Sequence, residues 1–423
     1  MLNGIISKLY ALSIIPLGLL SIFKFKNAGE QVALFSAYLA GSDVLFRMSG
    51  GLFLYEMHKY LIVFFVLFGL IIEQKRSYFS PLFLIYILLL LIGVVFTEVP
   101  FSESIRKNVL FNLSGPISLG FVAIYFYKRK ITLNKLLDIL FCLGLPVVSM
   151  ISFLYFKTPN IEEIRFGGTA SFAASGGYGP NQVSTMLGVG AFVIVAHLLT
   201  KKKFSGFFIF DIFLLTYILY RNLLTFSRGG FVTAIFSIVI LGSFLIYARK
   251  DSVKIFVKFL GFGLVFLIIL FIYTMNATEG MLQNRYTNKN ASGVEKADIT
   301  SGRLEIIDTE LIGLFENPIF GLGVGSSKYR RYEETGIYAA SHNEVTRMIG
   351  EHGMIGIIIL MLLFFTPITN ALKQPIYAWG YLGAFFTLWF LTINHSAMRV
   401  SFPGFIYGLS LIQITLQQKK LEH

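Results

Sequence analysis

The sequence predicts an all-α integral membrane protein with about twelve transmembrane helices and one large, outward-facing, partly helical loop. The mean hydropathy is +0.70, and 55% of the residues are hydrophobic while only 14% are charged. Apolar stretches close to the roughly 20 residues that cross a bilayer recur along the chain. A single long polar interruption, residues 276–352, separates the first nine of these stretches from the last three.

Twelve segments have the length and composition of a membrane span. They are residues 6–23, 56–73, 80–97, 108–127, 134–156, 183–200, 205–224, 229–247, 254–274, 353–371, 377–394 and 401–417. The first span has no small-residue cleavage site after it, so we expect it to be retained. A further apolar stretch is broken by Gly41, Ser42 and Asp43, and this predicts that residues 31–55 are a re-entrant or outer segment.

Basic residues fall at alternate connections, which sets the expected orientation. These clusters are Lys75-Arg76, Lys128-Arg129-Lys130, Lys201-Lys202-Lys203, Arg249-Lys250 and Lys419-Lys420. With twelve spans, all of them and both termini are expected in the cytoplasm. Residues 157–182 and 276–352 then face outward. Domain organisation follows: helices one to nine in residues 1–275, the large loop in 276–352, and helices ten to twelve with a cytoplasmic C-terminus in 353–420. Residues 421–423 resemble a tag remnant.

The formal charge of +13 does not indicate a nucleic-acid partner, because the lysines follow the positive-inside rule. The arginines do not, since most of them fall on the predicted outer side. Guanidinium groups pair bidentately with phosphate, so an outward-facing phosphate site is the favoured interpretation. The alternative is that these arginines pair with acids of the loop itself, namely Glu305, Asp308, Glu310, Glu333 and Glu334.

The large loop is expected to contain a helix in which apolar side chains recur at three- and four-residue spacing, at Leu304, Ile307, Leu311, Leu314 and Phe315. We expect this face to dock on the membrane surface or on the helix bundle. Thr300 or Ser301 could cap the helix, and Asn317-Pro318 should end it. Arg303 then lies in the first turn, where amide hydrogens and the helix dipole favour an anion.

His342 is the candidate general base, because a neutral imidazole can accept a proton from a hydroxyl nucleophile. The alternative is a structural histidine. Aspartates, glutamates and histidines do not cluster in a metal-binding pattern, so we expect chemistry without a metal or a cofactor. The single cysteine, Cys142, lies in a predicted span and supports neither a disulfide nor thiol catalysis.

Two further arginines lie close to predicted spans. Arg228 stands in the short outer turn 225–230, and Arg221 lies shortly before it. A charge at membrane depth is costly and indicates a function unless the side chain reaches the surface. The glycine- and serine-rich segment within residues 157–182 fits either a ligand-lining loop or a flexible connector.

Four motifs in this order resemble the O-antigen ligase and polymerase superfamily over roughly residues 160–360. They are Ser227-Arg228-Gly229-Gly230, Gly302-Arg303-Leu304, Asn317-Pro318 followed by Gly321-Leu322-Gly323, and His342-Asn343 followed by Glu351-His352-Gly353. The resemblance implies a glycosyltransferase C-like fold in the bacterial inner membrane. It also implies transfer of a glycan from undecaprenyl diphosphate to an acceptor hydroxyl at the periplasmic face, without metal or nucleotide.

Carried over by motif, Arg228 and Arg303 are expected to bind the diphosphate, and His342 to act as general base or to orient the acceptor. Asn343 and Glu351 are expected to support the site. Our interpretation adds Arg221, Arg330 and Arg331 to the diphosphate-binding set and Arg347 to the supporting set. Ile307 and Thr346 stand where many relatives carry Trp and Leu, so the acceptor side is expected to differ from theirs.

The expected reaction is a metal-independent, inverting displacement. The favoured acceptor is lipid A core oligosaccharide, as in an O-antigen ligase. The alternatives are an O-antigen or exopolysaccharide polymerase, which would use a second lipid-linked glycan, and a protein O-oligosaccharyltransferase. From a different class, a transporter of lipid-linked sugars is less favoured, because no two-fold repeat is evident.

Overall fold

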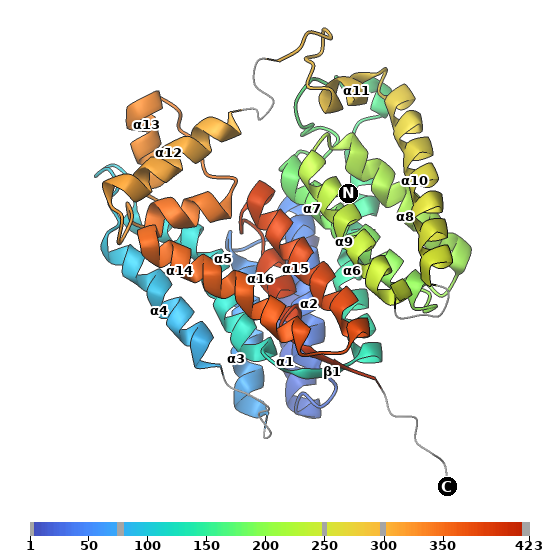
Figure 1. The fold of residues 1–423 in the computed structure, drawn as a ribbon, viewed down its shortest axis with the longest axis horizontal. Helices are drawn as coiled ribbons and strands as arrows, with labels where there is room; N and C mark the ends of the chain where they lie inside the picture. Colours follow the sequence, from blue (N-terminus) through green and yellow to red (C-terminus); the bar gives the residue numbers. More distant parts are fainter. Residues whose placement is uncertain (1–3, 74–79, 248–251, 297–301, 417–423) are drawn as a thin grey trace.

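In the computed structural model, which describes residues 4–73, 80–247, 252–296 and 302–416, helices run back and forth along one common direction (Figure 1). The elements are α1 (Gly4–Phe25), α2 (Gln31–Ser49), α3 (Met57–Ile72), α4 (Pro81–Val95), α5 (Ile105–Phe126), β1 (Lys130–Thr132), α6 (Leu133–Lys157), η1 (Ile161–Glu163), α7 (Pro180–Leu199), α8 (Phe208–Leu224), α9 (Arg228–Tyr247), α10 (Ser252–Ala277), α11 (Met281–Tyr286), α12 (Arg303–Glu316), α13 (Ser327–Thr335), α14 (Glu344–Leu372), α15 (Ile376–Ser396), α16 (Phe402–Leu409) and β2 (Gln413–Thr415).

Eight helices in the described residues are long and apolar enough to cross a bilayer: α1, α5, α6, α7, α9, α10, α14 and α15. α3 and α4 are shorter apolar helices. The protein is therefore an all-helical, multi-pass membrane protein. The last expected span, 401–417, is not one helix, because α16 ends at Leu409 and a short strand follows. α16 is buried along its whole length beside α5 and α15.

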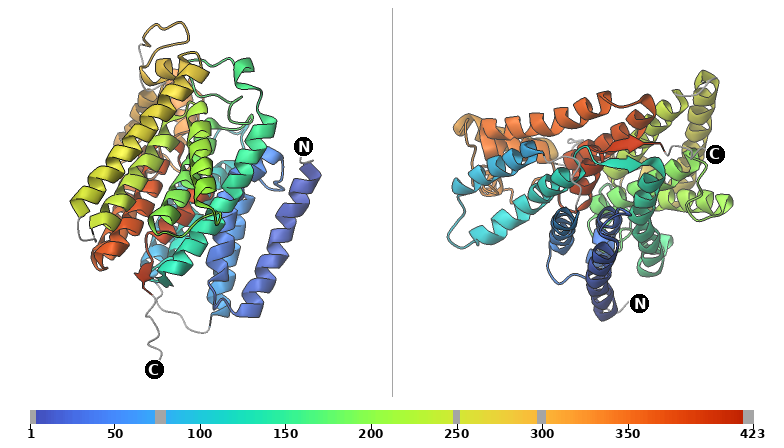
Figure 2. Two further views of the ribbon diagram at one scale, coloured as in Figure 1. Left: turned by 90° about the vertical axis from the view of Figure 1, so that its right-hand side faces the viewer. Right: turned by 90° about the horizontal axis from the view of Figure 1, so that it is seen from below.

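The two ends of the bundle differ, and they are named here by what they carry. At the strand end, β1 pairs in parallel with β2. Arg129 Nε also donates to Glu30 Oε2 at 2.7 Å there, and its guanidinium pairs with Glu73. The loop end carries α11, α12 and α13, which lie above the membrane-spanning helices (Figures 1 and 2).

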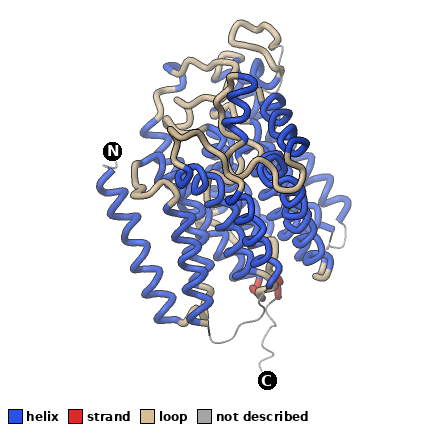
Figure 3. The backbone as a smooth tube through the Cα atoms, turned by 90° about the vertical axis from the view of Figure 1, so that its left-hand side faces the viewer, coloured by secondary structure: helices blue, strands red, loops and turns tan. Residues whose placement is uncertain are grey.

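The predicted re-entrant segment 31–55 is wrong in its helical part, because Gln31–Ser49 forms one continuous helix antiparallel to α1. Its buried Asp43 is stabilised by Arg47 Nε at 2.8 Å and by the amide of Ser401 at 2.8 Å. Asp43, which the sequence suggested as a break in a span, therefore forms an ion pair with Arg47 inside the protein. This extra crossing places the start of α1 toward the loop end and β2, the last described element, at the strand end (Figures 2 and 3), which differs from the prediction that both termini share one side.

The helix predicted in the large loop is confirmed as α12, and it ends at Glu316 before Asn317. The predicted apolar face does not dock on the helix bundle, whereas docking on the membrane surface stays a prediction. Leu304 and Phe315 are 56% and 80% exposed, and the buried face consists of Ile306, Thr309, Glu310 and Gly313. The missing side chain at Gly350 of α14 allows α12 to pack closely with this face inward, because a Cβ there would overlap the backbone carbonyl of Glu310.

Several predicted features lie outside the described residues. They are the basic pairs at 75–76, 249–250 and 419–420, the caps at 300–301, and the terminal residues 421–423.

Candidate anion-binding site at the loop end

Arg228 and Arg303 are each the first residue of a helix, α9 and α12 respectively. The turn before α9 is fixed by Phe226, whose φ is 55°, and by Ser227 Oγ, which donates to Asn181 Oδ1 at 2.8 Å. Unpaired amides and the positive end of the helix dipole already favour an anion at such a position. An arginine there strengthens this preference, so two helix starts carry an excess of positive charge.

Arg285 of α11 is a third arginine of the same cluster, although our interpretation of the sequence had not assigned it to the site. Its Nε donates to the carbonyl of Phe226 at 3.0 Å and its Nη1 to that of Gly168 at 3.1 Å. Burial, followed by the positive charges of Arg228 and Arg303, lowers the pKa of Arg285 to about 10. Burial and the charge of Arg228 likewise lower the pKa of Arg303. The three guanidinium groups therefore repel one another.

Within the described part of the chain, no carboxylate lies within 4.0 Å of Arg285 or Arg303. Neither Glu305 nor Asp308 neutralises Arg303, although the sequence left that possibility open. Uncompensated like charges are stabilised by a bound anion. Arg285 and Arg303 are therefore placed for an anionic ligand more than for internal ion pairs.

His342 joins this cluster through a small pocket that it shares with Arg303. The pocket has a volume of about 30 Å³ and is also lined by Ile306, Asn343 and Asn394, which is room for about one water-sized group. Asn343 Oδ1 accepts from the amides of Val345 at 2.9 Å and Thr346 at 3.4 Å, capping α14. The predicted supporting role of Asn343 is thus to fix the start of the helix beside His342.

Electrostatics keep the imidazole neutral. Desolvation, followed by the positive charges of Arg303, Arg399 and Arg331, lowers the pKa of His342 to about 4. At neutral pH the ring is free to accept a proton, but it is a weak base. A negative charge bound at the arginines would raise this pKa and make the base stronger.

Arg330 and Arg331 do not lie with the other three. Arg330 is partly exposed and pairs with Glu316 at 2.5 Å and Glu334 at 3.0 Å. Arg331 is buried, and its Nη2 lies 3.6 Å from Glu310 Oε1 of α12. For these two side chains the alternative holds, because the loop's own acids pair with them.

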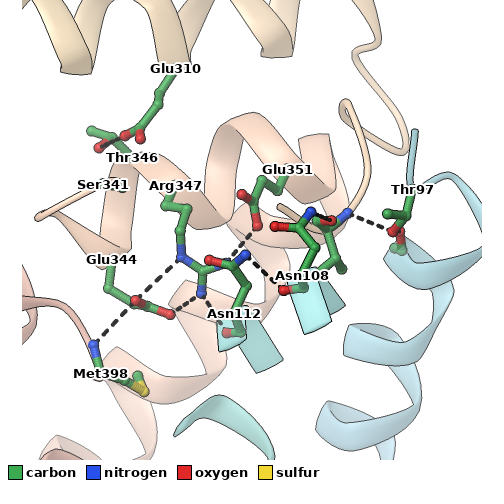
Figure 4. Close-up of polar contacts among 12 residues, drawn as sticks. Thr97, Asn108, Asn112, Glu310, Ser341, Glu344, Thr346, Arg347, Glu351 and Met398 are labelled. Carbon is green, nitrogen blue, oxygen red and sulfur yellow. Dashed lines mark hydrogen bonds and ion pairs between the residues drawn. The ribbon is translucent and has the colours of Figure 1, made fainter. Parts of the chain in front are cut away.

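Arg347 and Glu351 belong to a buried network of polar contacts, which Figure 4 shows. Arg347 pairs with Glu344, lies 2.5 Å from Glu351 Oε2 and donates to the carbonyl of Asn112 at 3.2 Å. Glu344 Oε2 in turn accepts from the amide of Met398 at 3.3 Å. The network joins α14 to α5 and to the segment after α15, so the two residues position helices and do not reach the pocket between Arg303 and His342.

Arg221 serves the neighbouring loop. Its Nη2 donates to Thr158 Oγ1 at 3.1 Å and to the carbonyl of Ala174 at 3.0 Å. This holds the segment 157–182 against α8. The assignment of Arg221 to the diphosphate site has no support in these contacts.

His395 is a further neighbour that the sequence did not single out. Its Nε2 lies 3.1 Å from Thr185 Oγ1, and a Cβ on Gly229 would lie 2.5 Å from its ring. The glycine after Arg228 therefore leaves space for this imidazole under the start of α9. No signal in the sequence pointed to His395, because it lies at the end of an ordinary apolar span.

Residues 212–361 match the family model described as O-Antigen ligase. The matched segment contains Arg228, Arg285, Arg303 and His342, and it confirms the resemblance drawn from the four motifs. No curated protein matches the chain significantly. Among the described residues, no group of three or more His, Cys, Asp or Glu side chains is placed to hold a metal ion.

Proposed function

We propose that this protein, in which residues 212–361 match the O-antigen ligase family model, transfers a glycan from a polyprenyl-diphosphate carrier to an acceptor hydroxyl. One observation carries the proposal. Arg285 lies among the positive charges of Arg228 and Arg303, which come from two other segments, and Arg303 shares a pocket with the neutral imidazole of His342. A lipid-linked diphosphate brings both a negative charge for Arg285 and Arg303, which have no carboxylate within 4.0 Å in the described part of the chain, and a leaving group.

In the proposed reaction, the acceptor oxygen attacks the anomeric carbon while the bond from that carbon to the diphosphate oxygen breaks. His342 takes the proton of the acceptor hydroxyl. The three arginines and the amides at the starts of α9 and α12 stabilise the charge on the departing diphosphate. A single displacement of this kind inverts the anomeric configuration. Because the diphosphate also raises the pKa of His342, the base becomes strong only when the donor is bound.

Among acceptors we propose lipid A core oligosaccharide, with the site facing the periplasm from the inner membrane. A polymerase would use a second lipid-linked glycan, and a protein O-oligosaccharyltransferase a protein hydroxyl. Deletion of the gene separates the first two, because losing a ligase removes all surface-attached glycan, whereas losing a polymerase leaves single repeats attached.

The activity is tested with purified protein in lipid nanodiscs, an undecaprenyl-diphosphate glycan and each class of acceptor, in excess EDTA. We expect product with one acceptor class and no membrane gradient. A transporter of lipid-linked sugars would give no product in this assay. Loss of the reaction in EDTA, restored by a divalent cation, would contradict the metal-independent mechanism.

A further inference from the structure

An apolar groove runs between α8 and α10 on the lipid-facing side of the protein. It has a volume of about 430 Å³, and its walls include Phe213, Tyr217, Tyr220, Phe266, Ile269 and Tyr273. α10 leans on the bundle along a narrow line, since only 6% of its apolar window is buried. The volume lies within the range of about 300–1,000 Å³ typical of small-molecule pockets.

The upper end of this groove lies about one helical turn below the connections that lead to Arg228 and Arg285. Tyr220 and Tyr273 each stand four residues, or about 6 Å, before the loop end of their helices. α8 leads directly into the turn before Arg228, and α10 leads into α11 with Arg285 (Figure 1). The hydrogen bond from Arg285 Nε to the carbonyl of Phe226, at 3.0 Å, holds these two connections together. A ligand with its charge on the arginines would therefore extend its tail between α8 and α10.

Three aromatic rings of α8 line one wall of the groove, and Tyr220 meets Tyr273 of α10 across its upper end. Ring centroids lie 6.4 Å apart between Phe213 and Tyr217, 6.4 Å between Tyr217 and Tyr220, and 5.5 Å between Tyr220 and Tyr273. Phe213, Ile269 and Tyr273 are 61%, 62% and 61% exposed, so the groove is open to an apolar chain from the bilayer. Flat aromatic faces pack well against the methyl branches and double bonds of an isoprenoid.

We propose that this groove binds the diphosphate-proximal isoprene units of the donor's polyprenyl chain. The inference rests on the proposed function and assigns the lipid part of the same substrate. Binding energy from this remote part of the donor would position the anomeric carbon for attack.

The test compares an undecaprenyl-diphosphate donor with a donor whose lipid is one isoprene unit, in detergent, with Thr216→Trp and Ile269→Trp as two independent variants. Both substitutions fill the groove from its open side and leave the arginines intact. Ser152→Trp is the matched control, because Ser152 lines a second, larger groove of about 640 Å³ between α2 and α6. Melting temperature confirms that each variant is folded.

We expect wild type and Ser152→Trp to show a lower KM for the undecaprenyl donor than for the short one. Both groove variants should raise the undecaprenyl KM about tenfold and leave kinetics with the short donor unchanged. An unchanged undecaprenyl KM in both variants would overturn the proposal, as would an equal loss with both donors or the same loss in Ser152→Trp. In these cases, turnover of the short donor shows that the transfer reaction itself is intact. No product from wild type with any donor would instead contradict the proposed function.

Discussion

At the scale of single residues, arginines in this protein differ in what faces them. Arg330 and Arg347 have carboxylate partners at 2.5 Å, whereas Arg303 and Arg285 face other guanidinium groups. Sequence shows how many arginines are present but not which acids reach them. Arg330 lies in the same predicted loop as Arg303, and only the structure shows that Glu316 pairs with it.

Replacing Arg303 tests whether the forked geometry matters. Arg303→Ala and Arg303→Lys should each lower kcat at least about a hundredfold, since a lost transition-state donor costs roughly 2.7–4 kcal/mol and lysine cannot bind two oxygens in one plane. Arg330→Ala is the control and should retain wild-type rates. Full activity in Arg303→Lys would reduce the role of Arg303 to its charge alone.

His342 should titrate far below an ordinary histidine. Its pKa of about 4 follows from desolvation and then from its cationic neighbours, of which Arg303 comes first. Removing that charge in Arg303→Ala, or binding inorganic pyrophosphate, should raise the pKa of His342. Histidine-labelled protein followed by NMR, with His342→Gln for assignment, measures this. A pKa of His342 near 6.5 that stays the same in Arg303→Ala and with pyrophosphate would contradict the described electrostatics.

At the scale of elements, the docking of α12 on α14 sets where Arg303 lies. A Cβ at Gly350 would overlap the carbonyl of Glu310, so Gly350→Ala should destabilise the protein by about 1–3 kcal/mol and lower transfer. Gly261→Ala in α10 is the matched control, because nothing lies within 4 Å of its added Cβ. Thermal melts and transfer rates compare the two. Equal behaviour of the two variants would argue against close packing at Gly350.

Glu310 makes this contact sensitive to pH. Burial raises the pKa of Glu310 to about 7, and Thr346 Oγ1 donates to its Oε2 at 2.7 Å. A carboxyl group with a raised pKa contributes stability in its protonated form, and this contribution is lost as the pH rises through 7. The melting temperature of Glu310→Gln relative to wild type should therefore rise between pH 6 and 8. A constant difference would show that Glu310 does not titrate in this range.

The elements show what the sequence could predict. Helical periodicity and Asn317-Pro318 predicted α12 and its C-terminal end, but its docking face depends on the close approach at Gly313 and Gly350, which a hydropathy pattern does not reveal. α2 was missed because Asp43 counts against a span until its partners, Arg47 and the amide of Ser401, are known. The site motifs were found because their residues are polar in apolar surroundings. His395 was missed because it belongs to none of the four motifs.

At the scale of the whole molecule, α2 changes the topology. The start of α1 lies toward the loop end, with Gly4 beside the carbonyl of Gly50, and β2 lies at the strand end with β1. An N-terminal tag should therefore be on the same side of the membrane as the large loop. In a cysteine-free Cys142→Ser background, a membrane-impermeant reagent should label cysteines at the N-terminus and at Glu333 together, and not one at Lys202. Labelling at the N-terminus together with Lys202 would restore the topology with both termini on one side.

The central claim is that arginines from separate helix starts form one diphosphate site. Its most direct measurement is the affinity of purified protein in nanodiscs for undecaprenyl diphosphate. We expect Arg228→Ala and Arg303→Ala each to weaken binding at least about tenfold, which is 1.4 kcal/mol, and Arg330→Ala to bind like wild type. Wild-type affinity in Arg228→Ala and Arg303→Ala, or an equal loss in all three variants, would contradict the account.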